Sequence, residues 1–263
     1  MMQDKTTNDW EWYHLDTDTL AVSLIKSMPP TQNWFYSAEI SSNGNIVAII
    51  AEDLNEKMIT SLYNQATLEF YDPLSTTPKE ESHISGFTLD DKVVLNYREP
   101  MAWRQNFVLH NPATKANTLI AEPGYTLSSS AEFTPDRKYF VLDAEEDATG
   151  WEVIILKDFV NNTTKVVKPT VASDCNYVGV TPDSSRIYLR AEYKDLVAYD
   201  IASDSFVQIT NNILFDKSVN FRILGHSKDN KKVFFRQDNW NDTETVKQYD
   251  FDTGETKIVA YSN

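Results

Sequence analysis

Carboxylates are the most numerous reactive side chains of this 263-residue chain, which has 39 Asp and Glu, 24 Lys and Arg, four His and one Cys. Two acids on either side of a glycosidic bond can hydrolyse it, one as acid and the other as base or nucleophile. So many acids allow many such pairs, and the sequence singles out none. Motifs for zinc hydrolases, serine hydrolases and phosphate loops (HExxH, GxSxG and GxxxxGK) are not found in the sequence.

The histidines and the cysteine point away from a shared catalytic centre. His14, His83, His110 and His226 are far apart along the chain. His110 occupies the strand-end position that Tyr71 and Tyr199 fill elsewhere, which indicates a structural role. A single cysteine, Cys175, forms no intrachain disulfide and no thiolate zinc site. We therefore predict no metal, no cofactor and no catalytic residue.

A short turn recurs five times, and it must position whatever site the chain has. A Ser or Thr stands two residues before a central Asn or Asp, and an apolar run follows. The central residues are separated by 47, 46, 47 and 46 positions: Asn43, Asp90, Asp136, Asp183 and Asp229. Such residues favour turns because their side chains bond the nearby backbone. Five of them spread around a ring predict a scaffold and not a catalytic cluster.

β-Strand sequences surround every turn. After the turns come runs rich in β-branched and aromatic residues, at 45–51, 92–98, 138–144, 186–192 and 232–238. One strand precedes each turn, and we place third strands at 67–72, 106–111, 152–158, 196–200 and 246–250, each followed by a fourth. Four antiparallel strands per repeat predict the blades of a β-propeller, an all-β fold.

The repeats resemble the WD40-like repeats of TolB and related propellers. The segment FTPDRKYFVLDAEEDATGWEVIILKD at 133–158 is similar to that family's pattern of an aromatic, Ser/Thr-Pro-Asp and a basic strand start, and TPDSSRIYLRAEYKDLVAYDI at 181–201 repeats it. The other three repeats are degenerate. The resemblance implies the fold along nearly the whole chain. It implies no single function, because the family includes protein scaffolds, peptidase gates and carbohydrate enzymes.

The number of blades is five and a half. We expect one domain over 1–263, with blades at about 31–80, 82–122, 126–170, 172–212 and 215–263 and a half-blade at 9–28. Residues 10–16 and 19–25 align with third and fourth strands. Propellers close so that no sheet edge is left open. Three explanations remain: a six-bladed ring with one incomplete blade, which we favour, a piece of a longer chain, or strands donated by a partner.

The face opposite the turns should carry the least regular residues. It includes Trp34, Trp103, Arg104, Trp240 and Asp242, which we predict to bind a partner. Aromatic residues among loop acids suit protein recognition. Packing between blades is the alternative for the tryptophans, and it is the one favoured for Trp151. The same face carries acids at 145–147 and an insertion at 52–65.

The channel of the ring is a second candidate. Four residues before each turn centre stand Glu39, Gly86, Glu132, Gly179 and Gly225. If this position faces the axis, Glu39 and Glu132 line the channel and leave space for a cation or a small basic ligand. The simpler interpretation is that small residues relieve crowding there.

Charge and composition limit the partners. A net charge of −15 has the wrong sign for nonspecific binding to nucleic acid, and a basic protein or peptide suits it. The sequence has no membrane-spanning run and its start does not resemble a signal peptide, so we expect a cytoplasmic protein, or a periplasmic or secreted one if a leader was removed. The predicted function is a non-catalytic propeller scaffold that binds a protein or peptide; the alternative is a carbohydrate-active or peptide-processing enzyme with channel carboxylates.

Overall fold

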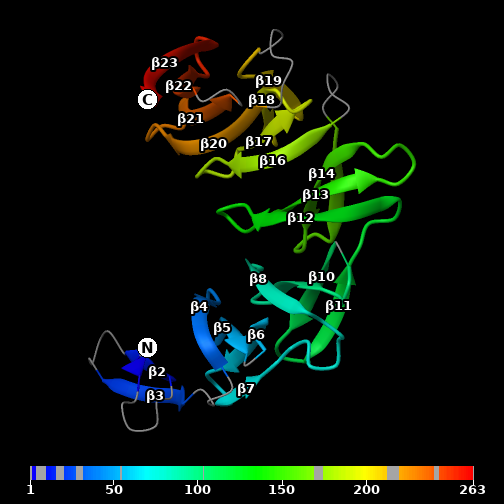
Figure 1. Ribbon diagram of the computed structural model, residues 1–263, viewed down its shortest axis with the longest axis vertical. Coiled ribbons are helices and arrows are strands. Elements are labelled where there is room, and N and C mark those ends of the chain that lie inside the picture. Colours follow the sequence, from blue (N-terminus) through cyan, green and yellow to red (C-terminus); the bar gives the residue numbers. More distant parts are fainter. Residues whose placement is uncertain are drawn as a thin grey trace. The chain divides into compact units, whose positions relative to one another are not determined.

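The structure is a computed structural model that describes residues 2–3, 10–15, 21–27, 32–53, 55–102, 104–168, 174–211, 219–239 and 243–262. Within these ranges every regular element is a β-strand (Figure 1). None of the described segments forms a helix that is long and apolar enough to cross a bilayer. The chain divides into two compact units, residues 1–120 and 121–263.

The first unit contains one three-stranded and two four-stranded antiparallel sheets. In chain order the strands are β1 (Met2–Gln3), β2 (Trp10–Leu15), β3 (Val22–Ser27), β4 (Gln32–Ile40), β5 (Ile46–Asp53), β6 (Met58–Asn64), β7 (Glu69–Tyr71), β8 (Glu81–Phe87), β9 (Val93–Arg98), β10 (Gln105–Asn111) and β11 (Ala116–Ile120). The predicted half-blade is thus three-stranded, because β1 pairs with β2.

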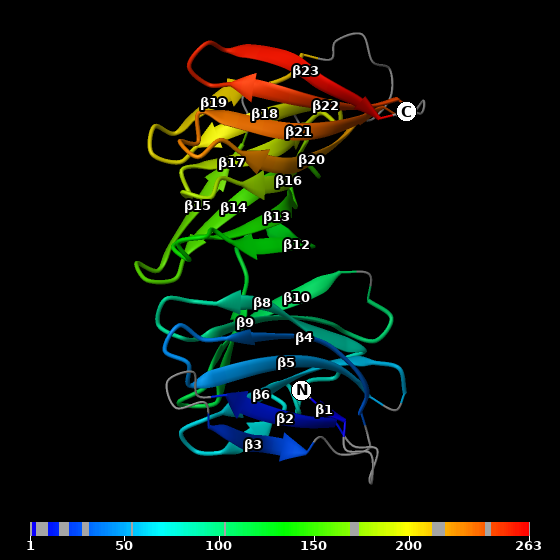
Figure 2. The same ribbon diagram turned by 90° about the vertical axis from the view of Figure 1, so that its left-hand side faces the viewer.

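The second unit contains three four-stranded antiparallel sheets that follow one another in chain order (Figure 2). Their strands are β12 (Tyr125–Phe133), β13 (Phe140–Glu146), β14 (Glu152–Asp158), β15 (Thr163–Val167), β16 (Cys175–Val180), β17 (Arg186–Ala191), β18 (Asp195–Asp200), β19 (Ser205–Gln208), β20 (Val219–His226), β21 (Lys232–Asn239), β22 (Thr243–Asp250) and β23 (Glu255–Ser262). The four-stranded meander that the repeats predict is confirmed in both units.

One strand prediction is wrong. Residues 58–64, predicted to lie in a loop insertion, form β6, a central strand that pairs with both β5 and β7. Residues 69–71, predicted as the third strand of that blade, belong to its fourth. The sequence MITSLYN does not show the apolar pattern expected of a buried strand, because Thr60 and Ser61 are polar yet buried. The Thr60 backbone N–H donates to the Ser82 hydroxyl on β8 at 2.8 Å, which offsets part of the cost of burying polar groups.

The five repeated turns share one geometry. In each turn, the carbonyl of the Ser or Thr accepts a hydrogen bond from the N–H three residues later. The Arg137 N–H, for example, donates to the Thr134 carbonyl at 2.7 Å. That third residue is left-handed every time, with φ between 54° and 75°: Gly44, Asp91, Arg137, Ser184 and Asn230. Thr88, Thr134 and Ser227 each donate a 2.6 Å hydrogen bond to the central Asp of their own turn. The structural role predicted for the central residues is therefore confirmed.

Neighbouring turns also bond one another. The Ser184 hydroxyl accepts the Asp136 N–H at 2.9 Å in the second unit. In the first unit the Asp91 carboxylate accepts the Ser42 N–H at 3.0 Å and its hydroxyl at 2.8 Å. Each bond joins turns of successive sheets, so the turns set the register of one blade against the next.

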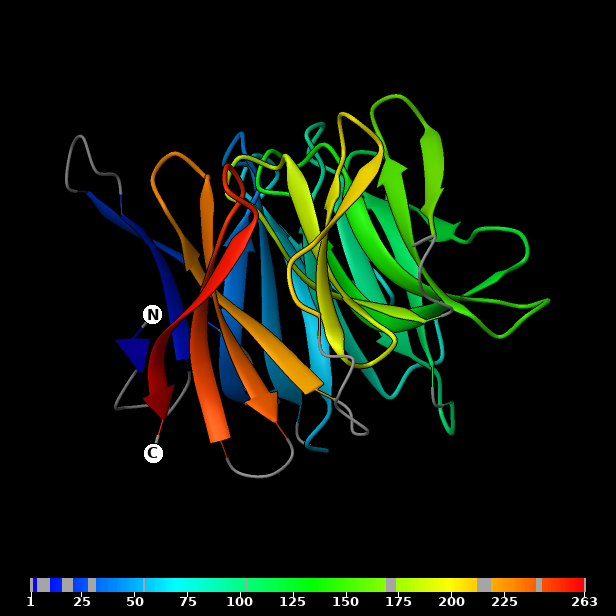
Figure 3. The ribbon, with the colours of Figure 1, turned by 90° about the horizontal axis from the view of Figure 1, so that it is seen from above.

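Within each unit, apolar cores lie between successive sheets, whose strands are twisted (Figure 3). One core joins Val141, Ile154 and Leu156 of one sheet to Ile187 and Leu189 of the next. A second joins Tyr188 and Ala198 to Val233, Phe235 and Tyr249. The first unit has the same arrangement, with Ile46, Ala48 and Leu62 packed near Val93 and Leu95. Burial of these side chains holds blade against blade and leaves polar residues for the strand ends.

Candidate functional site

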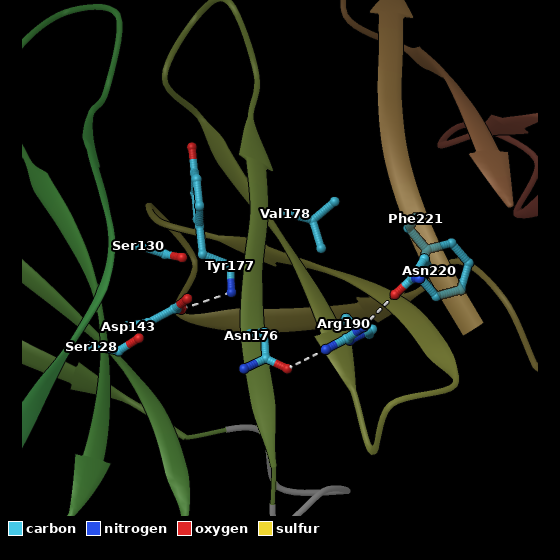
Figure 4. A pocket seen from close by; sticks show the side chains of 9 residues that line it. All are labelled: Ser128, Ser130, Asp143, Asn176, Tyr177, Val178, Arg190, Asn220 and Phe221. Carbon is cyan, nitrogen blue, oxygen red and sulfur yellow. Dashed lines mark hydrogen bonds between the residues drawn. The ribbon is translucent and has the colours of Figure 1, made fainter. Parts of the chain in front are cut away.

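A polar pocket of about 350 Å³ lies within the second unit (Figure 4). It is lined by parts of three successive sheets: Ser128, Ser130, Asp143, Asn176, Tyr177, Val178, Arg190, Asn220 and Phe221. Most of these residues belong to the first strands β12, β16 and β20. Asn176 stands near the start of β16 and Arg190 near the end of β17, so both lie at the strand ends remote from the repeated turn.

The pocket brings together two residues from equivalent positions of the repeat. Asp143, Arg190 and Arg236 each lie on the second strand of their sheet, three residues after the residue that forms the first strand pair beside the repeated turn. Arg190 lies opposite Asn176, and Arg236 lies opposite Arg222. Asp143 and Arg190 line the pocket, whereas Arg236 is outside it. Adjacent sheets therefore present an acid and a base to one cavity.

Amide groups hold the guanidinium of Arg190 (Figure 4). Its Nη1 donates to Asn220 Oδ1 at 2.7 Å, and its Nη2 donates to Asn176 Oδ1 at 2.8 Å. Asn176 is oriented by its own Nδ2, which donates to Glu152 Oε2 at 2.7 Å. The Tyr193 ring lies 5.1 Å from the guanidinium carbon. Among the described residues, Arg190 forms no ion pair with a carboxylate.

Burial dominates the behaviour of Asp143, which is only 7% exposed. Loss of solvent raises the pKa of this carboxyl from 3.8 to about 6, although the Tyr177 backbone N–H, which donates to it at 2.7 Å, opposes the shift. The charge of Glu152 raises the pKa further, and the charge of Arg190 lowers it. Asp143 thus changes its protonation near neutral pH.

Tyr177 and Glu132 connect the pocket to the predicted channel. The Tyr177 hydroxyl is buried, and the Glu132 carboxylate lies close to it. Burial first, and then the nearby Glu132 carboxylate, raise the pKa of this phenol far above its usual range. Glu132 is itself exposed on β12. The predicted channel acid therefore lies near the pocket, though it does not line it.

The other reactive side chains are held in structural roles. Cys175 is buried, its thiol donates to the Glu152 carbonyl at 3.4 Å, and burial raises its pKa strongly. His110 contacts the Tyr71 hydroxyl at 2.9 Å and Asn117 Oδ1 at 2.8 Å, and burial lowers its pKa. Its structural role is confirmed, but the residue equivalent to it in the first four-stranded sheet is Tyr63, since Tyr71 lies on β7.

The predicted partner-binding residues stay predictions. Trp34 lies on β4, and Arg104 is exposed before β10. Trp103, Trp240 and Asp242 lie outside the described residues. Trp151, expected to pack between blades, is instead 49% exposed, because it follows the left-handed Gly150 at the tip of a hairpin.

Three of the five positions predicted to line a channel lie beside irregularities in the first strands. Gly86, Gly179 and Gly225 each follow a register shift. A Cβ on Gly179 would come within 3.3 Å of Ile223, whereas one on Gly225 would meet nothing within 4 Å. Crowding therefore accounts for Gly179 alone of these two. Glu39 is exposed on β4 in the first unit, and Glu132 belongs to the second.

Sequence reasoning missed Asp143, Asn176, Arg190 and Asn220 altogether. The signal was present in part, because Asp143, Arg190 and Arg236 each stand seven residues after the central Asp of their turn. A charged residue recurring at one position inside apolar strands is unusual, since buried charges need partners. The asparagines had no such signal.

No family model matches this chain, and no curated protein matches it. Solved structures do. An oligogalacturonate lyase in complex with manganese is 10% identical over 97% of this chain and 73% of its own, with a TM-score of 0.57. Dipeptidyl peptidase 4 of Porphyromonas gingivalis is 12% identical over 95% of this chain and 42% of its own, with a TM-score of 0.66.

TolB from Acinetobacter baumannii is also among the structural neighbours. It is 17% identical over 94% of this chain, which spans 58% of the TolB chain, and the TM-score is 0.49. A score that low adds no support to the fold. The lyase and the peptidase share the fold at identities too low to carry function, and together with the four-stranded sheets they assign the chain to the β-propeller fold.

Proposed function

We propose that this protein is a non-catalytic β-propeller of the TolB type that binds a protein or peptide partner on the face opposite the repeated turns. The observation that carries the proposal is the polar pocket, to which three successive sheets contribute. A cavity of about 350 Å³ accepts one or two side chains of a partner, and pockets of that kind anchor larger interfaces.

The chemistry of the pocket supports binding over catalysis. Its lining includes neither a histidine nor a cysteine. The carboxylate of Asp143 already accepts a backbone hydrogen bond, and Arg190 is held by amides. The Ser130 hydroxyl lies beside the Asp143 carboxyl, but the lining offers neither of the usual partners of a covalent nucleophile, a histidine base or a cysteine thiol. Hydrogen-bond donors and acceptors that face one pocket without a histidine base or a cysteine thiol suit ligand recognition.

The predicted surface residues extend the proposed interface. In this proposal Trp34, Trp103, Arg104, Trp240 and Asp242 remain the residues expected to contact the partner from the loops. The proposal also includes a strand donated to the first sheet. There β1 pairs with β2 over two residues only, so most of that edge of β2 is open to a partner within the described residues.

A selection from a random peptide library displayed on phage tests this function. We expect binders that bind wild type and lose affinity for Asn176→Ala, which removes a side chain from the pocket. Lys231→Ala, at a turn of the opposite face, is the matched control and should retain them. Enrichment of no peptide, or binders that ignore the pocket variant, contradicts the proposal.

A second candidate is a carbohydrate-active or peptide-processing enzyme. The observation that favours it is Asp143, whose pKa of about 6 suits a general acid or base near neutral pH. The similar structures include a lyase and a peptidase by name. Screening oligosaccharide and peptide libraries for turnover tests this candidate. Activity that survives Asp143→Asn together with Glu39→Gln and Glu132→Gln would remove these carboxylates from the mechanism.

A further inference from the structure

We propose that Arg190 is the recognition residue of the pocket and that its partner supplies a carboxylate, carried by a peptide that is otherwise neutral or basic. This inference rests on the proposed peptide-binding function and specifies its ligand chemistry. It follows from three observations: the hydrogen bonds of Arg190, the charges around it, and the net charge of the chain.

The hydrogen bonds of Arg190 fix its guanidinium and leave donors free. A guanidinium has five N–H groups, and two of them are used by Asn220 and Asn176. One N–H therefore remains on each terminal nitrogen. A planar fork held in place loses little entropy when it binds a carboxylate, which it matches in shape. The two asparagines are thus positioning residues for the arginine.

No described carboxylate lies at ion-pair distance from Arg190, and the Asp143 carboxyl, which lines the same pocket, interacts with it only through its charge. The hydrogen-bond acceptors of Arg190 are neutral amides, and Asn176 stands between it and the Glu152 carboxylate. Arg236, at the equivalent position of the next sheet, pairs with Asp238 at 2.8 Å and Glu244 at 3.6 Å. A chain with 39 acids and 24 bases has ample carboxylates to pair with both. A cation left with amide partners in a pocket is suited to an anion from outside.

The net charge of the chain limits which carboxylate can reach the pocket. At −15 the protein repels a strongly acidic peptide at long range, and it attracts a basic one. A neutral or basic peptide with a single carboxylate is not repelled by the negative net charge of the protein, and its carboxylate can still bind Arg190. Such a carboxylate comes from an Asp or Glu side chain or from the C-terminus, and the two sources require different probes.

Three synthetic peptide sets test the inference by calorimetry. All have neutral or basic sequences: one carries a single Glu and an amidated C-terminus, one has a free C-terminus and no acid, and one has neither. We expect the first or the second set to contain binders, and the third none. Arg190→Gln should weaken binding by roughly tenfold to a hundredfold, as expected for a lost hydrogen bond to a charged group.

Arg236→Gln is the matched control. It removes the equivalent charge from the next sheet outside the pocket, so the affinity for carboxylate peptides should stay unchanged. Equal loss with both variants would overturn the role of Arg190 in recognition. Circular dichroism of both proteins verifies that each is folded.

The outcomes separate this inference from the function on which it rests. Peptides that bind equally with and without a carboxylate, and equally to Arg190→Gln, overturn the inference and leave peptide binding intact. If no peptide binds, the proposed function fails, and N-acetylglycine, which has one carboxylate, against N-acetylglycinamide, which has none, then decides the site. A saturable shift of the ¹⁵N-labelled Arg190 side chain with N-acetylglycine alone supports the carboxylate site, and a shift with both or with neither overturns it.

Discussion

Arg190 and Arg236 occupy the same position in two successive sheets of the second unit and have opposite surroundings. Arg236 is paired with Asp238 and Glu244, which are close along its own hairpin. Arg190 is held by Asn176 and Asn220, one of them on the next sheet. The same repeat position thus serves structure in one blade and is open to a ligand in the other. The two arginines differ in whether nearby carboxylates pair with the guanidinium charge.

Asp143 extends the comparison to a third sheet. It stands at the equivalent position, but it is an acid that is buried without a cationic partner at ion-pair distance in the described residues. Burial raises its pKa to about 6. The three positions therefore show an unpaired acid, an amide-held base and a paired base. Each predicts a different response to mutation.

The largest expected effect is on stability, at Asp143. A carboxyl whose pKa is 3.8 when unfolded and about 6 when folded binds its proton more tightly in the folded state, so stability falls as pH rises between these values and is constant above them. We expect Asp143→Asn to remove this penalty and to stabilise the protein by about 3 kcal/mol at pH 8.

Urea unfolding of wild type and Asp143→Asn at two pH values measures this effect. At pH 5 the wild-type carboxyl is mostly protonated when folded, and the gain should fall to about half of its value at pH 8. A stability difference that does not change with pH would mean that Asp143 titrates normally and is not buried as described.

The next largest effect is expected when Arg190 is given a carboxylate partner, as Arg236 has. Asn220→Asp places a carboxylate 2.7 Å from Nη1, where the amide oxygen now lies. We expect the affinity for a carboxylate peptide to fall about tenfold or more, which corresponds to about 1.4 kcal/mol. The new ion pair should stabilise the fold slightly, by about 0.2–1 kcal/mol. Calorimetry and thermal unfolding measure the two. Binding that survives the substitution would show that Arg190 need not be free.

The smallest effect is expected at Arg236. Its side chain is 34% exposed, and those of its partners are 29% and 41% exposed. Solvent screens pairs of this kind, so Arg236→Gln should cost about 1 kcal/mol or less. The cost should shrink in high salt, whereas Arg190→Gln should show no such salt dependence. Unfolding midpoints in low and high salt measure it. A larger loss of stability in high salt for Arg190→Gln than for Arg236→Gln would contradict the assignment of Arg236 as the paired arginine.

The repeats made much of the fold predictable. The Ser/Thr and Asp of each turn act on their own backbone within a few residues, as Thr134 and Asp136 do. Such short-range bonds act in the same way in every copy, so the turns and the strands beside them could be read in order. The failure at Met58–Asn64 has the opposite cause, because Thr60 and Ser61 are buried through contacts with another sheet.

The candidate site was not predictable in the same way. Trp34, Trp103, Arg104, Trp240 and Asp242 were chosen for being irregular, and they stay predictions. Asn176 and Asn220 look like ordinary strand residues in the sequence. Their function in holding Arg190 depends on the packing of β16 beside β20, which no local pattern encodes.

By itself, then, the sequence determined the period, the turns and the antiparallel four-stranded blades, because the bonds that build them join residues close along the chain. Only the tertiary structure decided which of the equivalent positions, Asp143, Arg190 and Arg236, have a charge left to offer. The partners of Arg190 lie 14 and 30 residues away on two different strands. Long-range packing sets whether such a charge is paired, and with it where a partner can bind.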